Sequence, residues 1–561
     1  MTHVMHMTGG QALARQLALE GLRDIFCVPG VQLDWAVDGI REMGDAFRLL
    51  IPRHEQATSY MADGYARASG RIGVCMTVPG PGLTNAMAGL STAYACSSPL
   101  LSITGQIHSS TIGAGYGMLH EIKGQSDLIG SVTKWHGIAT TPAQVPGLVR
   151  EAVTRLRCGR PQPVGIEIPH DVLSTAADIE LVQPPQGADG RLAPAAEQIE
   201  AAAALLADAK FPVIHAGGGV LAADASAALE ALAERLQAPV ITTETSRGAI
   251  SDRHPMAANS VAGRALIRHA DVVLVVGSRF MNRMAPAPQW TSTSTQFIYL
   301  NVEAEAAAPP RKPGLLVHAD ARLGLEALAR AVPAARTSRV EIVEAARAWA
   351  ARQIREVEPQ FAYVQALRRA IPENGFLINE LTQVGYLSTI AYPLYQPRTL
   401  ITPGYQGTLG FGFPTALGVA AAMPDRAVVC ITGDGGFGWG MQELATARRY
   451  GLNMVVVVFN DGHFGNVRLL QQQTFGHTIG VELCNPEFGK LADAFGIPSA
   501  VASSPEEMEG ALRAALARGG PSLLEVRVGP MPSAWHLIGY NSVFKRPSPE
   551  PADPVAGLLT R

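Results

Sequence analysis

The sequence has little charge, few aromatic residues and no long apolar run. Only 17% of its 561 residues are charged, the formal net charge is -3, and aromatic residues make up 6%. A charge this close to balance provides no basic field for nucleic acid, so no nucleic-acid partner is expected. The apolar runs are short, as at residues 454–459, whereas a membrane span needs about 20 residues. No membrane partner is expected either.

Cysteine pairs and targeting signals are also missing. The six cysteines lie far apart and form no CxxC pair, which argues against a zinc site and against a disulfide framework. The N-terminus lacks the charged segment followed by an apolar run that is typical of a signal peptide. We therefore expect buried thiols in a cytoplasmic protein.

The chain is instead rich in hydrophobic residues (47%), with 57 glycines and 39 prolines. Short β-branched runs alternate with alanine-rich stretches of helical periodicity, a rhythm that predicts an α/β protein with parallel sheets. At about 150 residues per domain, the length predicts three to four domains.

We expect three domains and a short tail, at residues 1–175, 190–332, 355–545 and 546–561. The stretch Pro184–Gly190 has the composition of a linker. Prolines accumulate from Pro530 onward, so this end of the chain is predicted to be a surface arm and not part of a core.

The most informative stretch is the glycine-rich segment 433–438. It follows a buried strand at Ala427–Thr432 and is expected to open a helix at Met441. Glycines at such a turn let backbone N–H groups face a phosphate. The segment also fits GxGxxG, and Asp461 ends the next strand, where a nicotinamide-binding enzyme places its ribose-binding acid. A dehydrogenase is therefore one alternative.

Asp434, among these glycines, favours a different function. A carboxylate that points at a pyrophosphate repels it unless a cation lies between them. Asn460 ends the neighbouring strand, after 24 residues that follow Gly435. Its side-chain oxygen and the backbone carbonyl of Gly462 complete the expected protein share of a Mg²⁺ shell, together with Asp434.

This spacing resembles the thiamine-diphosphate (ThDP) motif of the acetolactate synthase and pyruvate decarboxylase superfamily. The resemblance extends from about Gly9 to Pro530, and a dehydrogenase would leave Glu55 unexplained. Three further segments match the family in the right order: Arg53–Gln56 with Ala62–Gly70, Gly80–Asn85, and Gly407–Gly412.

The resemblance implies three parallel-sheet α/β domains: a pyrimidine-binding domain, a Rossmann-like middle domain and a diphosphate-binding domain. It implies ThDP and Mg²⁺ as cofactors. In this superfamily the site forms across two subunits, so a homodimer is the minimum and a homotetramer is expected.

The resemblance also implies roles for single residues. Glu55 matches the glutamate that activates ThDP through its aminopyrimidine ring, and Leu409 matches the apolar residue that bends the cofactor. His120 is the candidate for proton transfer to or from the bound intermediate, and Gln125 lies near a glutamine that faces substrate. The expected cofactor-binding residues are Pro81, Gly82, Asn85, Gln383, Gly407, Thr408, Leu409, Gly433, Asp434, Gly435, Gly436, Asn460, Gly462, Phe464, Gly465 and Asn466.

The function that the resemblance implies is that of an acetolactate synthase-like enzyme. Such an enzyme makes or breaks a C–C bond next to a carbonyl, here expected on a 2-oxo acid. The alternative in the same class is a decarboxylase or lyase for another 2-oxo acid, a 1,2-diketone or a 2-hydroxyacyl compound. A nicotinamide dehydrogenase and a non-catalytic homologue are the alternatives from other classes.

Two departures from the family bear on substrate and cofactor. Leu469 and Leu470 stand where biosynthetic acetolactate synthases carry a glutamine and a tryptophan, so weak acetolactate formation from pyruvate is expected. The middle domain resembles a flavin-binding domain at residues 217–219 and 277–280, but the stretch between Pro255 and Asp271 is shorter than the flavin-wrapping loop. FAD binding is therefore left open.

Overall fold

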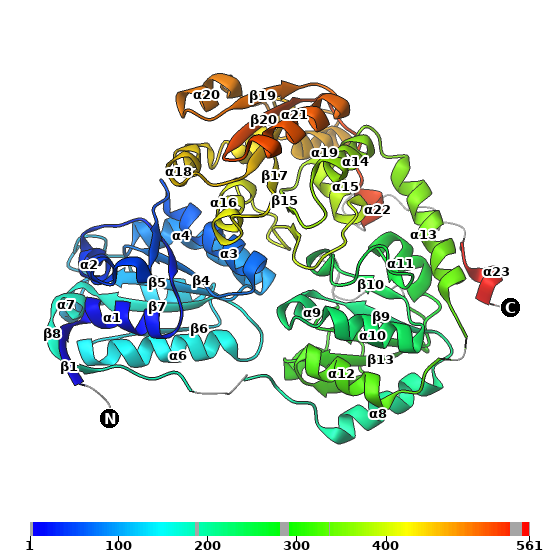
Figure 1. Ribbon diagram of the computed structural model, residues 1–561, viewed down its shortest axis with the longest axis horizontal. Coiled ribbons are helices and arrows are strands. Elements are labelled where there is room, and N and C mark those ends of the chain that lie inside the picture. Colours follow the sequence, from blue (N-terminus) through cyan, green and yellow to red (C-terminus); the bar gives the residue numbers. More distant parts are fainter. Residues whose placement is uncertain (1–3, 186–189, 281–290, 336, 539–552, 560–561) are drawn as a thin grey trace.

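The computed structural model describes residues 4–185, 190–280, 291–335, 337–538 and 553–559 of the chain. These residues form three α/β units, each built on a six-stranded parallel sheet (Figure 1). The predicted fold class, with three parallel-sheet domains, is confirmed. Part of the predicted linker Pro184–Gly190 lies outside the described residues.

The N-terminal unit, blue to cyan in Figure 1, carries a sheet with the strand order β3-β2-β4-β5-β7-β6. An antiparallel pair, β1 with β8, lies beside it. Its elements are β1 (Val4–Thr8), α1 (Gly9–Leu19), β2 (Asp24–Cys27), η1 (Val31–Leu33), α2 (Asp34–Glu42), η2 (Gly44–Ala46), β3 (Arg48–Leu50), α3 (Glu55–Ser69), β4 (Gly73–Thr77), α4 (Pro81–Cys96), β5 (Leu100–Gln106), η3 (Ser109–Thr111), α5 (Gln125–Gly130), β6 (Trp135–Ile138), η4 (Pro142–Gln144), α6 (Val145–Arg157), β7 (Val164–Pro169), α7 (His170–Ser174) and β8 (Ala176–Glu180).

The middle unit, green in Figure 1, has the strand order β11-β10-β9-β12-β13-β14. This is the 3-2-1-4-5-6 order of doubly wound nucleotide-binding sheets. Its elements are α8 (Ala196–Asp208), β9 (Pro212–Ala216), α9 (Gly218–Ala222), α10 (Ser226–Leu236), β10 (Val240–Thr242), η5 (Glu244–Ser246), β11 (Ala257–Ala258), α11 (Ser260–Ile267), β12 (Val272–Val276), β13 (Gln296–Asn301), η6 (Ala304–Ala307), β14 (Leu315–His318) and α12 (Ala321–Ala331), followed by the connecting helix α13 (Val340–Arg355).

The C-terminal unit, yellow to red in Figure 1, has the strand order β16-β15-β17-β18-β20-β19. Its elements are α14 (Gln360–Ala370), β15 (Phe376–Asn379), α15 (Gln383–Ala391), β16 (Leu400–Ile401), α16 (Gly412–Ala422), β17 (Val428–Gly433), α17 (Asp434–Phe437), η7 (Met441–Glu443), α18 (Leu444–Tyr450), β18 (Val455–Asn460), α19 (Gly465–Phe475), α20 (Phe488–Ala494), β19 (Ser499–Ala502), α21 (Pro505–Arg518), β20 (Ser522–Arg527), α22 (Trp535–Ile538) and α23 (Ala556–Leu559).

The first and third sheets have the same topology. When the strands of each sheet are numbered in chain order, leaving out β1 and β8, both sheets read 2-1-3-4-6-5. Only the middle sheet follows the nucleotide-binding order. The two ends of the chain therefore carry one repeated framework, although their sequences show no repeat.

Helices α3 and α16 join these two related units at close range. A Cβ on Gly64 of α3 would collide with the carbonyl oxygen of Thr415, and a Cβ on Gly418 of α16 would collide with that of Met61. Glycine at these two positions lets the backbones approach each other. The first residue of α3 is Glu55, so this contact helps to fix where that carboxylate lies.

One prediction about local structure is incomplete and one is wrong. The helix predicted at Met441 is present, as η7 followed by α18, but the additional short helix α17 begins directly after β17. The end of the chain is not only a surface arm, because Ala534, Leu537 and Val555 are buried in a core shared with the middle and C-terminal sheets. The prolines here prevent neither short helices such as α22 nor the packing of apolar side chains.

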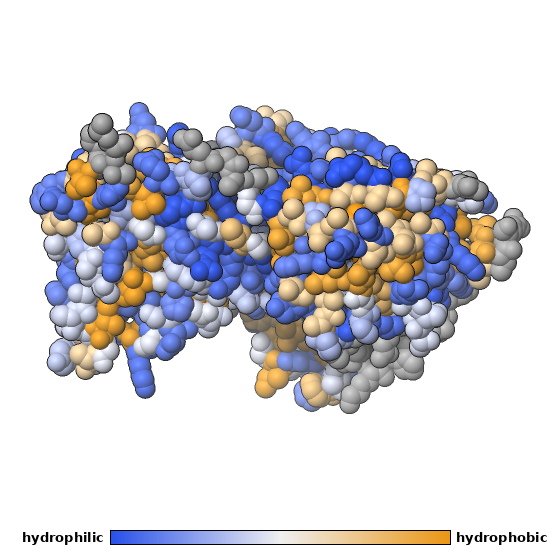
Figure 2. Space-filling view, turned by 90° about the horizontal axis from the view of Figure 1, so that it is seen from below, coloured by the Kyte–Doolittle hydropathy of each residue, from blue (hydrophilic) through white to orange (hydrophobic). Residues whose placement is uncertain are grey.

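The surface adds two observations. Seen from below, the N-terminal and middle units form two lobes with a notch between them, and the surface beside this notch mixes hydrophilic and hydrophobic residues (Figure 2). In the described part of the chain, no helix has the length and hydropathy of a membrane span.

Candidate functional site

The ends of β17 and β18 bring the predicted metal ligands together. These strands are parallel neighbours, and Gly433 pairs with Phe459. Asp434 and Asn460 directly follow this pair in the chain, so both side chains emerge at the same carboxyl edge of the sheet. Ligands of open parallel sheets bind at this edge.

Asp434 and Asn460 share the same two hydrogen-bond donors. The Gly462 N–H donates to Asp434 Oδ2 (3.0 Å) and to Asn460 Oδ1 (3.2 Å). The side-chain amide of Asn485 donates to the same two oxygens, at 2.6 and 3.2 Å. The Gly462 carbonyl, a predicted ligand, accepts from Leu483 N (2.8 Å) and keeps a second lone pair.

The electrostatics of Asp434 fit a cation. Burial raises the pKa of this carboxyl above its ordinary value, and neighbouring Asp461 raises it further, while the hydrogen bond from Asn485 lowers it. A divalent cation beside Asp434 would stabilise its charged form. Carboxylate, amide and carbonyl oxygens are the donors that Mg²⁺ prefers, so the residues present fit Mg²⁺.

Buried Glu380 packs against the glycine-rich turn. Its carboxylate accepts from Gly410 N (2.8 Å), Gly412 N (2.9 Å) and the Thr432 hydroxyl (2.9 Å). A Cβ on Gly436 would collide with this carboxylate. Burial raises the pKa of Glu380, and the three hydrogen bonds oppose that shift. Glu380 thereby ties the 407–412 loop to the turn that carries Asp434.

The other predicted cofactor residues of this unit lie around the same edge. Gln383, at the start of α15, donates from Nε2 to Asn466 Oδ1 (3.4 Å). Its Oε1 is buried without a hydrogen-bond partner among the described residues. A Cβ on Gly435 would come within 2.8 Å of the ring of Phe464, so the turn fits tightly against the loop that follows β18. An unpaired buried acceptor is costly, so the amide of Gln383 lacks a partner that the described residues do not supply.

The predicted Gly407–Gly412 loop lies between the two related units. The Thr408 hydroxyl is 3.0 Å from both the Tyr60 hydroxyl and the Thr92 hydroxyl of the N-terminal unit. Gly407 and Gly410 have positive φ angles. Leu409 between them is 46% exposed, so its side chain is available to contact a ligand.

Glu55 begins α3 and is held from two sides. The side-chain amide of Asn85, in α4, donates to Glu55 Oε2 (3.0 Å). Buried Glu443 of the C-terminal unit accepts from the backbone N–H groups of Arg53 (3.0 Å) and His54 (3.0 Å), the two residues before Glu55. Glu55 is half-buried. Glu55 is therefore in direct contact with Asn85, a predicted cofactor-binding residue.

His120 and Gln125 both lie near the predicted Gly80–Asn85 segment, but in different ways. His120 is half-buried, has a φ of 68°, and its carbonyl oxygen packs against Gly80. Gln125 is buried: its Oε1 accepts from Gly80 N (2.8 Å), and its Nε2 donates to Gly105 O (3.0 Å) and Glu167 (2.8 Å). The amide of Gln125 is therefore committed to the protein itself.

The site residues form two groups within one chain. One surrounds Asp434 and the other comprises Glu55, Asn85, His120 and the start of α4, where Pro81 and Gly82 lie. In the described residues, no hydrogen bond joins Glu55 or Asn85 to the Asp434 group.

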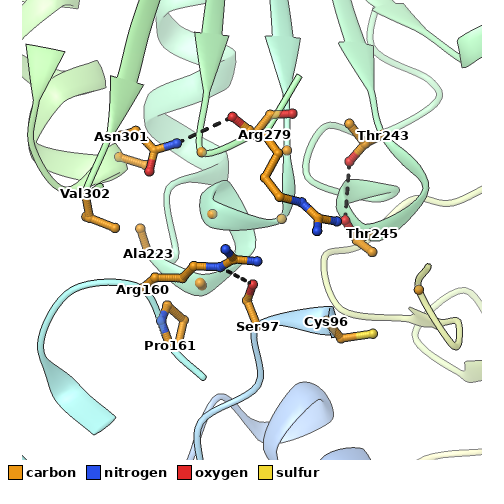
Figure 3. A pocket seen from close by; sticks show the side chains of 18 of the residues that line it. Cys96, Ser97, Arg160, Pro161, Ala223, Thr243, Thr245, Arg279, Asn301 and Val302 are labelled. Carbon is orange, nitrogen blue, oxygen red and sulfur yellow. Dashed lines mark hydrogen bonds between the residues drawn. The ribbon is translucent and has the colours of Figure 1, made fainter. Parts of the chain in front are cut away.

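A separate cavity of about 1820 Å³ lies where the three units meet. Arg279 of the middle unit and Arg160 of the N-terminal unit both extend into it (Figure 3), and Arg160 donates to the Ser97 hydroxyl (2.8 Å). Burial and the nearby charge of Arg160 lower the pKa of Arg279. His215 in the wall is 7% exposed, and its Nδ1 lacks a hydrogen-bond partner among the described residues.

The glycines of this cavity have a packing explanation. A Cβ on Gly217 would collide with the Gly277 carbonyl, and a Cβ on Gly219 would come within 2.7 Å of the Gly277 backbone. The turns after β9 and β12 need these glycines to pass each other. The glycines alone are therefore no evidence for a nucleotide-binding site.

Three sequence families match the three units. The N-terminal TPP binding domain of thiamine pyrophosphate enzymes matches residues 7–128, the central domain of these enzymes matches residues 199–328, and their C-terminal TPP binding domain matches residues 383–526. The chain belongs to the thiamine pyrophosphate enzyme family, in its acetolactate synthase-like branch. The dehydrogenase alternative is wrong.

Relatives of this ThDP enzyme match it over nearly their whole lengths. The probable 2-ketoarginine decarboxylase of Pseudomonas aeruginosa is 35% identical over 93% of this chain and 94% of its own. The acetolactate synthase isozyme 3 large subunit of Escherichia coli is 30% identical over 91% and 92%. The structure of a ThDP-dependent 4-hydroxybenzoylformate decarboxylase from Rhodococcus jostii aligns with a TM-score of 0.81 at 25% identity, over 93% of this chain and 99% of its own. This ThDP enzyme is therefore a carboligase or lyase.

Sequence reasoning missed several residues of the site. Glu380 directly follows a buried strand, which is the signal that could have identified it. Glu443 lies in the helix predicted from Met441, and no local signal indicates its contact with Arg53 and His54. Asn485 lies in a loop 25 residues after Asn460, and no sequence signal connects it to Asp434.

Proposed function

We propose that this ThDP enzyme decarboxylates a 2-oxo acid with the help of Mg²⁺, and then either releases an aldehyde or joins the fragment to a second carbonyl compound. The observation that carries this proposal is the pair of oxygens from Asp434 and Asn460, which share their donors at the edge of the C-terminal sheet. The unpartnered Oε1 of Gln383 lies at the same edge.

The C-terminal unit holds the diphosphate end of the cofactor in this proposal. Asp434, Asn460 and the carbonyl of Gly462 bind Mg²⁺, and the backbone N–H groups of the glycine-rich turn face the phosphates. Bound ThDP supplies a carbon nucleophile that adds to the substrate carbonyl. Leu409 and Phe464 support its rings through apolar contact.

Glu55 is the proton-transfer group at the pyrimidine end. Its Oε2 already accepts from Asn85, so the carboxylate is oriented while Oε1 remains available. The clamp from Glu443 onto Arg53 and His54 fixes the start of α3. A fixed carboxylate that gives and takes one proton meets the geometric requirement for general acid–base catalysis.

His120 moves a proton on the substrate side, and Gln125 acts as a positioning residue. The Gln125 amide donates to Gly105 and Glu167 and its oxygen accepts from Gly80, so it holds the Gly80 turn in place. This role replaces the contact with substrate that the sequence led us to expect.

The substrate side favours decarboxylation over ligation. Leu469 and Leu470 in α19 are half-buried and apolar. They offer no hydrogen bond to a second 2-oxo acid, and an unpaired polar group on that acceptor would weaken its binding. Two of the relatives described above are decarboxylases by name.

A second copy of the chain completes the site in this proposal. Leu409, Trp439, Phe475 and Ile479 are 46%, 57%, 65% and 79% exposed, and all come from the C-terminal unit around the candidate site. Large apolar side chains that stay exposed in this unit support an interface there. We therefore propose a homodimer at least, and a homotetramer as the working assembly, located in the cytoplasm.

The cavity between the units is the place to test for FAD. It has room for a dinucleotide, Arg160 and Arg279 suit phosphate groups, and His215 offers an unpaired ring nitrogen. Its glycines, however, are explained by packing alone. Absorbance near 450 nm of the purified protein decides the point, since a colourless protein that FAD does not activate excludes a flavin role.

The experiment that tests the function uses protein stripped of cofactor. ThDP and Mg²⁺ are added with pyruvate, 2-ketoarginine or 4-hydroxybenzoylformate, and CO₂ and carboligation products are measured. We expect CO₂ release that requires both additions, with little acetolactate from pyruvate. Rapid acetolactate synthesis would instead indicate a biosynthetic acetolactate synthase. The absence of CO₂ from every 2-oxo acid would refute the proposal.

A further inference from the structure

Among the described residues, the ring of His120 hydrogen-bonds with one side chain, that of Gln32. Gln32 is 7% exposed and lies in the turn η1, far from His120 in the sequence. His120 Nδ1 is 3.0 Å from Gln32 Oε1, and Gln32 Nε2 donates to the Leu119 carbonyl (3.1 Å). One amide therefore contacts both the ring of His120 and the backbone immediately before it.

These two contacts determine which ring nitrogen of His120 carries a proton. The Leu119 carbonyl can only accept a hydrogen bond, so the atom of Gln32 that faces it must be the NH₂ group. The other atom, which faces His120 Nδ1, is then the carbonyl oxygen, which also can only accept. Nδ1 must therefore carry a hydrogen whether the ring is neutral or protonated, independently of how the amide was placed.

The backbone of His120 is held from the opposite side. A Cβ on Gly80 would collide with the His120 carbonyl oxygen, so the loop rests directly on the Gly80 turn. Gly80 is in turn fixed by Gln125, whose amide is anchored on Glu167 of strand β7. Glu167 is fully buried. These contacts fix the position of both the backbone and the ring of His120.

We propose that Gln32 is a positioning residue that holds neutral His120 as the Nδ1–H tautomer, so that Nε2 is the atom that exchanges a proton with substrate. The proposal rests on the proposed function, in which His120 transfers a proton. In the neutral ring Nε2 then has its lone pair available to accept a proton, and in the protonated ring it donates one. The nitrogen that is used is set by the hydrogen bond on the other nitrogen.

Two variants separate the tautomer from the support of the loop. Gln32→Glu keeps an acceptor at Nδ1 but cannot donate to the Leu119 carbonyl. Gln32→Leu is similar in size and removes both contacts. The full-length protein, labelled with ¹⁵N-histidine and loaded with ThDP and Mg²⁺, is studied by solid-state NMR after sedimentation, and His120→Asn identifies the signal of His120.

We expect the Nδ1–H tautomer in the wild type and in Gln32→Glu, and a shift toward the Nε2–H tautomer in Gln32→Leu. A Gln32→Leu protein with an unchanged tautomer overturns the proposal. So does a wild type in which neutral His120 carries its proton on Nε2. These outcomes do not depend on turnover, so they are distinguishable from a failure of the proposed function.

Kinetics supply the second readout. With the fastest substrate among pyruvate, 2-ketoarginine and 4-hydroxybenzoylformate, Gln32→Leu should lower kcat about tenfold or more. In a His120→Ala background the same change should have almost no further effect, since the two residues act as one unit. An equal loss in both backgrounds would show that Gln32 only supports the fold, and would overturn the proposal.

Discussion

The turn around Asp434 and the loop around His120 are built in opposite ways. Asp434 is 3% exposed at the end of a central strand, and Asn485 and Gly462 both donate to it. His120 is half-buried at the end of a loop in which Tyr116 and Leu119 are 75% and 61% exposed. The first region has the rigidity needed to anchor a cofactor, and the second has the access needed to meet substrate. Variants of the two regions should therefore fail differently, one in binding and the other in turnover.

Asp434→Ala should have the largest effect. Removing this carboxylate takes away the charge that holds Mg²⁺, so ThDP affinity in the presence of Mg²⁺ should fall by on the order of 100-fold or more. Titration calorimetry of ThDP with and without Mg²⁺ measures it. Asp434→Asn keeps the shape of the side chain and serves as the control for folding. An unchanged Mg²⁺ dependence in Asp434→Ala would place the metal elsewhere.

Glu55→Gln should bind ThDP as the wild type does and yet lose most turnover. Gln keeps the size of the side chain and still accepts the hydrogen bond from Asn85, but it transfers no proton. A general acid–base group contributes about 100- to 10,000-fold, so kcat should fall within that range. Steady-state kinetics at saturating ThDP test this. Full activity in Glu55→Gln would overturn the assignment of Glu55.

His120→Ala should have a smaller effect, confined to turnover. The loop lies away from the Asp434 turn, so the affinity for ThDP should stay within about twofold while kcat falls about 10- to 100-fold. Calorimetry and CO₂ release measured on the same preparation provide both values. A weakened ThDP affinity with normal kcat would contradict the proposal that the Asp434 turn binds the cofactor while the His120 loop serves turnover.

The smallest effect should appear at Glu443, which holds the start of α3 against the C-terminal unit. Burial raises the pKa of this carboxyl, while its hydrogen bonds with Thr446, Arg53 and His54 lower it. A raised folded-state pKa means that its contribution to stability is complete below the unfolded pKa, near 4.5, and is lost as pH rises through the folded value.

Glu443→Gln removes this titration. The difference in melting temperature between wild type and Glu443→Gln should therefore shrink, by roughly 2 to 4 °C, between pH 5 and pH 8. Thermal melts of both proteins in matched buffers measure it. A difference that grows with pH would mean that Glu443 is more stable in its charged form in the folded protein.

The sequence predicted the parts of the site that depend on adjacent residues. Asp434 and Asn460 end neighbouring strands, so motif spacing and the rules of parallel sheets were enough to bring them together. Gln32, Asn485 and Glu443 act through contacts across loops or units, and nothing in local composition indicates such partners. The common topology of the first and third sheets was also hidden, since strand order depends on crossovers and not on repeated residues.

The buried end of the chain shows the same limit. Pro530 and the prolines after it predict a surface arm, but Leu537 lies in the short helix α22 and fills, with Ala534, a core between units. Local signals describe which backbone conformations are excluded. They do not describe where an irregular segment packs.

The most direct test of the central claim is CO₂ release by cofactor-stripped protein from pyruvate, 2-ketoarginine and 4-hydroxybenzoylformate. We predict release from at least one of these 2-oxo acids only when ThDP and Mg²⁺ are both present. We also predict that Asp434→Ala loses this activity. CO₂ release that proceeds without ThDP, or that persists in Asp434→Ala at wild-type Mg²⁺ and ThDP concentrations, would contradict it.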